Sequence, residues 1–126
     1  MRHRRFSLRG RLNSFRYAGK GISLMIRTQH NAWIHTLATF AICGVALYAG
    51  ISGTEWCAII LAIISVWTAE ALNTALEFLA DVASPDFHPL VEKAKDVAAG
   101  AVLISAIGAT LIALIVVIPY LRMRVA

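Results

Sequence analysis

Three long apolar stretches, separated by short polar segments, dominate the pattern of this sequence. No Asp, Glu, Lys or Arg occurs in residues 36–54, in residues 56–69 or in residues 97–120. A helix of about 20 apolar residues is long enough to cross the hydrocarbon core of a bilayer. We therefore predict an all-α membrane protein with three transmembrane helices, in preference to a soluble bundle of unusually apolar helices.

Turn-forming residues indicate where these helices begin and end. We place the first span at about residues 32–50 and the second at about 55–83, which is long enough for its last turns to leave the membrane. The turn at Ser84-Pro85-Asp86 also favours the start of a helix. The third helix is then predicted from near Pro89 to Ile118, with Pro119 ending it.

The segment before the first span has a different pattern, with apolar residues at helical spacing and basic residues between them. The apolar positions are Leu8, Leu12, Phe15, Gly19, Ile22 and Ile26, and the basic ones are Arg9, Arg11, Arg16, Lys20 and Arg27. This pattern predicts an amphipathic helix on the surface of the cytoplasmic leaflet. The alternative is a merely basic flank that follows the positive-inside rule. A nucleic-acid-binding arm is not expected beside three spans.

Charge adds an orientation to this picture. The chain has 126 residues, 59% of them apolar, whereas a soluble domain averages about half. Eight of the twelve Lys and Arg residues lie in residues 1–27, Lys93 and Lys95 lie in the second loop, and residues 50–55 contain none. The positive-inside rule therefore places the N-terminus and the 82–96 loop in the cytoplasm.

These patterns divide the chain into three parts. We expect a basic N-terminal segment with an interfacial helix at 1–31, a three-span domain at 32–122 and a tail at 123–126. A bundle of three spans is thin, and the third helix carries a row of small residues that would allow close helix contacts. The row consists of Ala98, Ala101, Ser105, Ala109 and Ala113. We therefore expect a homo-oligomer.

The candidate chemistry lies on one face of the second span. Glu70, Glu77 and Asp81 fall within about 40° of one another on a helix, and Asn73 lies about 60° to one side. Ionisable groups at membrane depth are costly and normally face a partner, a cavity or a reaction. Six of the seven acidic residues lie between positions 70 and 96, on the predicted cytoplasmic side. This face is therefore a candidate reaction site.

A short loop makes the second and third helices antiparallel neighbours, so Lys95 and Asp96 can approach Glu77 and Asp81. Carboxylates bind Mg²⁺ together with phosphate oxygens, and a lysine provides a point charge for phosphates. Phosphoryl transfer depends mainly on such positioning and charge neutralisation. The alternative without a catalytic role is a structural ion pair of Lys95 with Asp81 or Asp96. No Walker loop or protein-kinase glycine loop is present in the sequence.

Glu70 lies about two turns deeper in the membrane than the other carboxylates. A carboxyl group there could accept a proton from a buried alcohol. It could instead be a protonated residue satisfied by a neighbour, and Asn73 could serve only to join two helices. By themselves, these residues fit a proton or ion pathway about as well as a kinase.

Two motifs resemble a known family. They are E-x-x-N-T-A-x-E-x-x-x-D, from Glu70 to Asp81, and K-D-x-A-A-G-A-V, from Lys95 to Val102. They resemble the small bacterial integral-membrane lipid kinases, the family of prokaryotic diacylglycerol kinase and undecaprenol kinase. The similarity covers roughly residues 13–118. It implies a three-span homotrimer in the bacterial inner (cytoplasmic) membrane, with sites shared between subunits, MgATP as donor and a membrane lipid alcohol as acceptor.

The resemblance also implies roles for individual residues. Glu70 matches the catalytic base, and Glu77 matches the metal-binding carboxylate, with Gln29 at the position of a second metal ligand. The other matches belong to the nucleotide site and its support: Tyr17, Asn73, Glu77, Asp81, Asp86, His88, Lys95 and Asp96.

Two details refine the expectation. The family often has Glu at the position of Gln29, and an amide would bind Mg²⁺ without charge. His35 and the loop Ser84–Leu90 resemble the undecaprenol-kinase branch more closely. We therefore expect a kinase for an undecaprenol-type polyprenol first and for diacylglycerol second. A non-enzymatic or proton- or ion-coupled membrane protein is the alternative.

Overall fold

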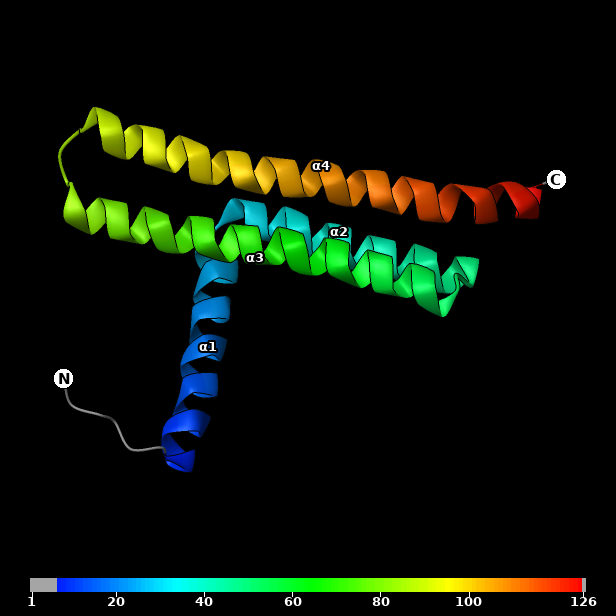
Figure 1. Ribbon diagram of the computed structural model, residues 1–126, viewed down its shortest axis with the longest axis horizontal. Coiled ribbons are helices and arrows are strands. Elements are labelled where there is room, and N and C mark those ends of the chain that lie inside the picture. Colours follow the sequence, from blue (N-terminus) through cyan, green and yellow to red (C-terminus); the bar gives the residue numbers. More distant parts are fainter. Residues whose placement is uncertain (1–6, 126) are drawn as a thin grey trace.

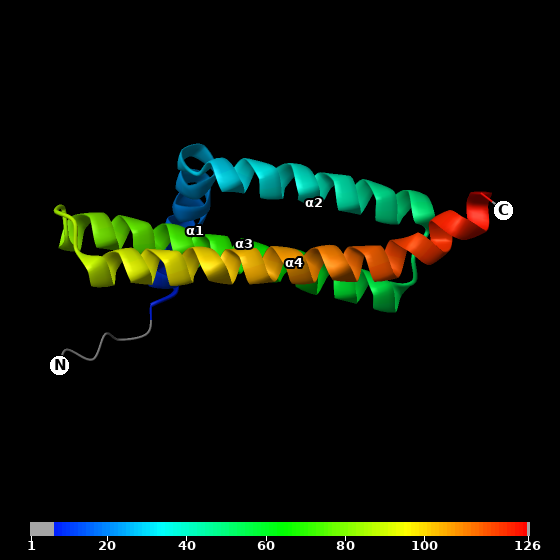
Figure 2. The same ribbon diagram turned by 90° about the horizontal axis from the view of Figure 1, so that it is seen from above.

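The structure is a computed structural model that describes residues 7–125. Within this range the chain forms four helices, α1 (Leu8–Thr28), α2 (His30–Ala49), α3 (Gly53–Ala83) and α4 (Pro89–Val125). Helices α2, α3 and α4 run side by side in alternating directions, and α1 projects away from them (Figures 1 and 2). The all-α prediction is confirmed. Residues 1–6 of the basic segment and residue 126 of the expected tail lie outside the described residues.

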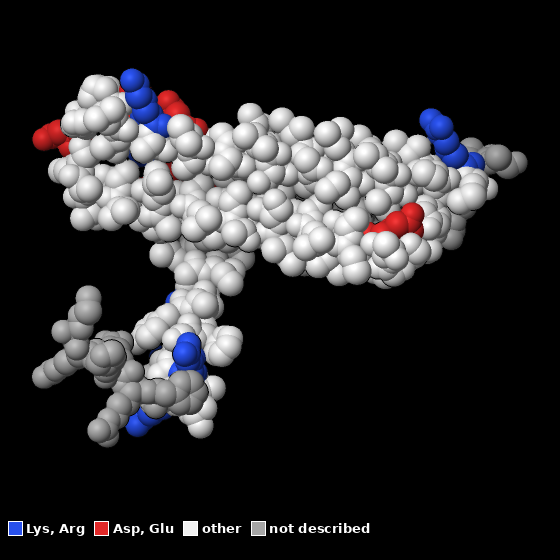
Figure 3. All heavy atoms as spheres, viewed as in Figure 1, with Lys and Arg blue, Asp and Glu red and all other residues white. Residues whose placement is uncertain are grey.

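Three of the helices are long and apolar enough to cross a membrane: His30–Ala49, Gly53–Ala83 and Pro89–Met123. Their outer surface is apolar, with Leu37 and Ile115 each 73% exposed. On the face shown in Figure 3, charged side chains gather at the two ends of the bundle and on α1, and the middle is free of them. An apolar exterior of this kind suits lipid or a neighbouring subunit. The prediction of three spans is confirmed.

The end of α4 differs from the sequence-based expectation. The helix does not stop at Ile118 but continues through Pro119 to Val125. Proline removes one backbone donor, and its fixed φ remains compatible with a helix. Membrane helices tolerate the residue because neighbouring groups can satisfy the freed carbonyl. The prediction that Pro119 ends the helix was therefore wrong.

The turn between α2 and α3 closes one end of the bundle tightly. Gly50 ends α2 with a positive φ of 69°, which a side chain would disfavour. Ser52 and Glu55 then form a reciprocal capping box at the start of α3, and Tyr120 of α4 donates a hydrogen bond to Glu55 Oε2 (2.5 Å). The apolar core at this end consists of Ala46, Ala49, Ile51, Ile59, Val116 and Val117.

Gln29 forms the corner between α1 and α2. Its backbone is extended (φ −105°, ψ 119°), and it ends one helix and precedes the next. The break allows α1 to leave the bundle at a steep angle (Figure 1). The apolar row of α1 stays exposed except at Ile26, with Leu8 at 73% and Phe15 at 77%. A helix exposed in this way is well suited to lie in a membrane surface, which stays a prediction.

Candidate active site

The corner at Gln29 brings its side chain against α3. Gln29 Nε2 donates to Glu77 Oε2 (3.2 Å), and Asn73 Nδ2 donates to Glu77 Oε1 (3.2 Å). Asn73 and Glu77 face each other because they are one helical turn apart. Glu77 is half-buried, and each of its carboxyl oxygens accepts a hydrogen bond from an amide. The predicted metal-site residues Gln29 and Glu77 therefore lie together, with Asn73 as a third member.

Asn73 has one group that its own chain does not satisfy. The residue is 5% exposed, and its Oδ1 is buried without a hydrogen-bond partner. An unsatisfied buried acceptor costs about 1–3 kcal/mol. A cation or a bound ligand with a donor group would supply the missing partner.

Glu70 is completely buried, at 0% exposure. Both of its carboxyl oxygens lack a hydrogen-bond partner, while its backbone carbonyl accepts a hydrogen bond from Thr74 Oγ1 (2.9 Å). His35 Nε2 on α2 lies 3.5 Å from Glu70 Oε2, which is ion-pair distance, but the alignment does not make a hydrogen bond. The predicted base is thus a buried carboxyl group that faces an imidazole.

Lys95 on α4 pairs with Asp81 on α3, with Nζ 3.2 Å from Oδ1. Both side chains are substantially exposed, at 41% for Lys95 and 68% for Asp81. Exposed pairs of this kind contribute only about 0–1 kcal/mol. The pair is therefore weak enough to rearrange around a charged ligand, and it also matches the structural alternative considered for Lys95.

The remaining predicted residues lie apart from this cluster. Within residues 7–125, no hydrogen bond or ion pair joins the side chains of Tyr17, Asp86 or Asp96 to it, and all three residues are exposed. His88 has a structural role, since its Nδ1 accepts a hydrogen bond from the Leu90 N–H (3.2 Å) at the start of α4. Nucleotide contacts of these four residues stay a prediction.

The donor set suits a cation that is shared with a nucleotide. Within residues 7–125 no group of three or more His, Cys, Asp and Glu side chains could hold a metal ion. Mg²⁺, however, commonly binds through one or two carboxylates together with waters and phosphate oxygens. Glu77 and the unpartnered Asn73 Oδ1 are hard oxygen donors of the right kind. Gln29 contributes its N–H to Glu77, so its amide would have to turn to offer its oxygen.

Sequence reasoning missed His35 as a member of the site. The pattern that singled out Glu70, an ionisable side chain inside an apolar span, also applies to His35. The contact itself joins residues on two helices that only the folded bundle brings together.

Sequence comparisons settle the family. Residues 16–117 match the profile of the prokaryotic diacylglycerol kinase family. The chain belongs to this family. It is 38% identical over 108 residues to undecaprenol kinase of Bacillus subtilis, a match that covers 86% of this chain and 88% of the relative.

Two diacylglycerol kinases are also similar. The Synechocystis protein is 39% identical over 102 residues, covering 80% of this chain and 58% of the relative. The Helicobacter pylori protein is 40% identical over 76 residues, covering 60% and 59%. These matches confirm the predicted family and the enzyme class, a lipid kinase of the membrane. Membership implies ATP as the phosphoryl donor and a membrane lipid as the acceptor.

Proposed function

We propose that this kinase transfers the γ-phosphate of MgATP to the hydroxyl group of an undecaprenol-type polyprenol, with diacylglycerol as the second choice of acceptor. The observation that carries the choice is the extent of similarity. The match to undecaprenol kinase covers 88% of that relative, whereas the matches to the two diacylglycerol kinases cover 58% and 59% of theirs.

In this proposal Glu70 is the general base. A completely buried carboxyl group with two unpartnered oxygens can accept a strong hydrogen bond from an alcohol. The acceptor oxygen forms a bond to the γ-phosphorus as its proton moves to a Glu70 oxygen. The bond between the γ-phosphorus and the β–γ bridging oxygen breaks, and ADP leaves. Glu70 returns the proton to solvent before the next turnover.

Glu77 and Asn73 would hold the metal beside the phosphates, with Gln29 orienting Glu77 through its amide N–H. When bound, Mg²⁺ neutralises charge on the transferred phosphoryl group. Lys95 would exchange part of its contact with Asp81 for a phosphate oxygen, since the exposed pair costs little to open. By resemblance, Tyr17, Asp86, His88 and Asp96 complete the nucleotide site.

The proposal extends to the setting of the protein. We place it in the bacterial inner membrane with the N-terminus in the cytoplasm, because the basic residues concentrate before the first span. Residues 1–31 form an interfacial segment and residues 32–122 the kinase domain. A homotrimer would cover part of the exposed apolar surface of the bundle.

A lipid panel tests the function directly. The purified protein in nanodiscs receives γ-labelled ATP, Mg²⁺ and one acceptor at a time: undecaprenol, a shorter polyprenol, a diacylglycerol or a ceramide. We expect label in the polyprenol fraction at the highest kcat/KM. Faster labelling of the diacylglycerol would reverse the order of the two acceptors, and label in no lipid would refute a lipid kinase activity. The variant Glu92→Gln carries an exposed change at the start of α4 and serves as the matched control for Glu70→Gln.

A further inference from the structure

Four buried polar atoms among the described residues have no hydrogen-bond partner: His35 Nε2, Glu70 Oε1, Glu70 Oε2 and Asn73 Oδ1. Three of them belong to the facing pair His35 and Glu70, one on α2 and one on α3. Buried polar atoms are normally satisfied, so a cluster of exceptions needs a reason. The function proposed above gives Glu70 a role but none to His35.

The imidazole of His35 is held in place by its neighbours. The Trp67 ring packs against it edge to face, with centroids 6.4 Å apart and planes at 68°. Trp67 Nε1 donates to Thr39 Oγ1 (3.0 Å), and Thr39 Oγ1 donates to the His35 carbonyl oxygen (2.7 Å). The same tryptophan and threonine therefore restrain both the ring and the backbone of His35. Its side chain is only 12% exposed.

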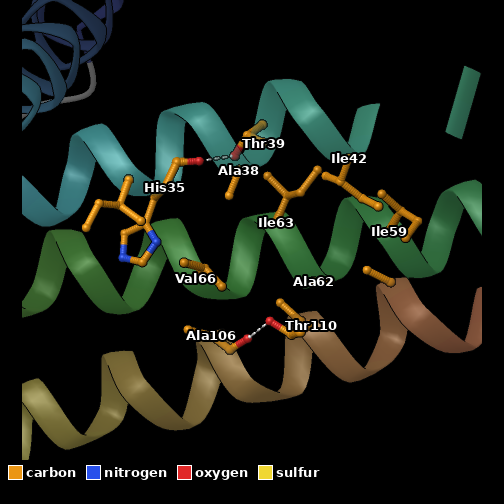
Figure 4. A pocket seen from close by; sticks show the side chains of 13 residues that line it. His35, Ala38, Thr39, Ile42, Ile59, Ala62, Ile63, Val66, Ala106 and Thr110 are labelled. Atoms are coloured by element: carbon orange, nitrogen blue, oxygen red, sulfur yellow. Dashed lines mark hydrogen bonds between the residues drawn. The ribbon is translucent and has the colours of Figure 1, made fainter. Parts of the chain in front are cut away.

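The other residues that line the groove beside the His35 ring carry no charge. The residue lines a groove of about 260 Å³ between α2, α3 and α4, whose walls are mostly apolar (Figure 4). From α3 the wall residues include Ile63 and Val66, and from α4 they are three alanines and Thr110. The Thr110 hydroxyl donates to the carbonyl of Ala106 in its own helix (2.8 Å). Glu70 is thus the titratable side chain that the ring faces, and Glu77 and Lys95 take part in other contacts.

We propose that His35 is a positioning residue for Glu70, an inference that rests on the proposed role of Glu70 as the base. With its proton on Nε2, the imidazole donates to Glu70 Oε2 after a small rotation of the unpartnered carboxyl group that shortens the 3.5 Å separation. The bond fixes the carboxyl plane and leaves Oε1 for the acceptor hydroxyl. His35 itself does not touch the reacting atoms.

Three variants and one double variant test this inference. His35→Leu removes the donor at similar size, His35→Gln keeps an N–H, and Thr110→Val is the control because it changes the same groove away from Glu70. For each variant we would measure kcat, the KM values for ATP and lipid, and the thermal unfolding midpoint. Loss of the partner that orients a metal ligand typically lowers activity by about 10–100-fold, and we take the same range for a partner of the base. We expect His35→Leu to lose kcat in this range with an unchanged KM for ATP, His35→Gln to recover most of it, and Thr110→Val to match the wild type.

The double variant separates positioning from a structural effect. If His35 acts through Glu70, adding His35→Leu to Glu70→Gln causes no further loss of kcat, because the group it orients is already gone. The inference would be overturned if the kcat losses of the two single variants multiply in the double variant. It would also be overturned if folded His35→Leu has the wild-type kcat. If His35→Leu does not fold, His35→Gln decides the question. A folded His35→Gln that loses as much activity as Glu70→Gln would refute the expected rescue and overturn the inference.

The outcomes also distinguish this inference from the proposed function. If the wild-type protein labels no lipid, both the proposed function and this inference are refuted. If the wild-type protein labels lipid, Glu70→Gln loses activity and His35→Leu keeps it, only the role of His35 is refuted.

Discussion

Glu55 and Glu70 lie on the same helix, α3, and their surroundings differ in kind. Glu55 Oε2 accepts hydrogen bonds from the Ser52 N–H (2.8 Å), the Ser52 hydroxyl (2.7 Å) and the Tyr120 hydroxyl (2.5 Å). Glu70 is more deeply buried, at 0% exposure, and neither of its carboxyl oxygens has a partner. The Glu55 carboxylate is held by three hydrogen bonds, whereas the Glu70 carboxyl group is buried without any.

Under the proposed function, this difference separates a stabilising carboxylate from a reactive one. A hydrogen bond to a charged group adds to stability, and a buried polar group without a partner lowers it. Glu55 therefore stabilises the end of the bundle that is tightly packed. Glu70 lies near the middle of α3, one turn before the buried Asn73, and its carboxyl group is a buried polar group that its own chain leaves unsatisfied. Active sites often hold such locally unfavourable groups because the bound substrate satisfies them.

Glu70→Gln gives the largest effect that this comparison predicts. The amide keeps the shape of the side chain but cannot accept the proton, so kcat should fall by about 10²–10⁴-fold. The affinity for ATP and the thermal unfolding midpoint should not fall, because no existing hydrogen bond of the carboxyl group is lost. Steady-state kinetics, nucleotide titration and thermal unfolding on one preparation measure all three. Full turnover in the variant would remove Glu70 from the mechanism.

The next largest effect concerns Glu77, which lies between the amides of Gln29 and Asn73. Glu77→Gln removes the carboxylate of the proposed metal site. Gln29→Ala removes only an orienting partner and should lower activity within the roughly 10–100-fold range of such losses. Rates at several Mg²⁺ concentrations should therefore rank wild type above Gln29→Ala and Gln29→Ala above Glu77→Gln. The reverse ranking would place the metal elsewhere.

Gln29→Glu should have a smaller effect, on Mg²⁺ dependence. A second carboxylate beside Glu77 strengthens the attraction for a hard dication, and the repulsion between the two carboxylates is relieved when the cation binds. We expect half-maximal rate at a lower Mg²⁺ concentration than in the wild type. If Gln29 only holds the corner between α1 and α2, the variant keeps its activity and its Mg²⁺ curve does not move.

Much of this fold could be predicted from the sequence because the bilayer imposes a length and a composition on each span. The charge-free runs gave α2, α3 and most of α4 for this reason. Pro119 was the exception, since a proline rule derived from helix interiors in water does not end a membrane helix whose freed carbonyl other groups can satisfy.

The site could be predicted only as far as one helix determines it. Asn73 and Glu77 share a face of α3 by helical spacing, and the structure adds the hydrogen bond between them. The contact of His35 with Glu70 depends on how α2 packs against α3, which no local pattern specifies. The direction of the Gln29 amide depends on the extended backbone at the corner after α1.

Ser52→Ala should give the smallest effect and the opposite pattern to Glu70→Gln. Ser52 Oγ accepts the Glu55 N–H (3.3 Å) and donates to Glu55 Oε2, so the substitution removes half of the capping box. Loss of an N-cap side chain costs about 1 kcal/mol of stability. The thermal unfolding midpoint should therefore fall slightly while kcat at a temperature well below it stays at the wild-type value. Thr54→Ala, an exposed change in the same first turn, should move neither quantity. A loss of turnover in Ser52→Ala at unchanged stability would show that the Glu55 end is coupled to the chemistry, and the division of roles between the two carboxylates would no longer hold.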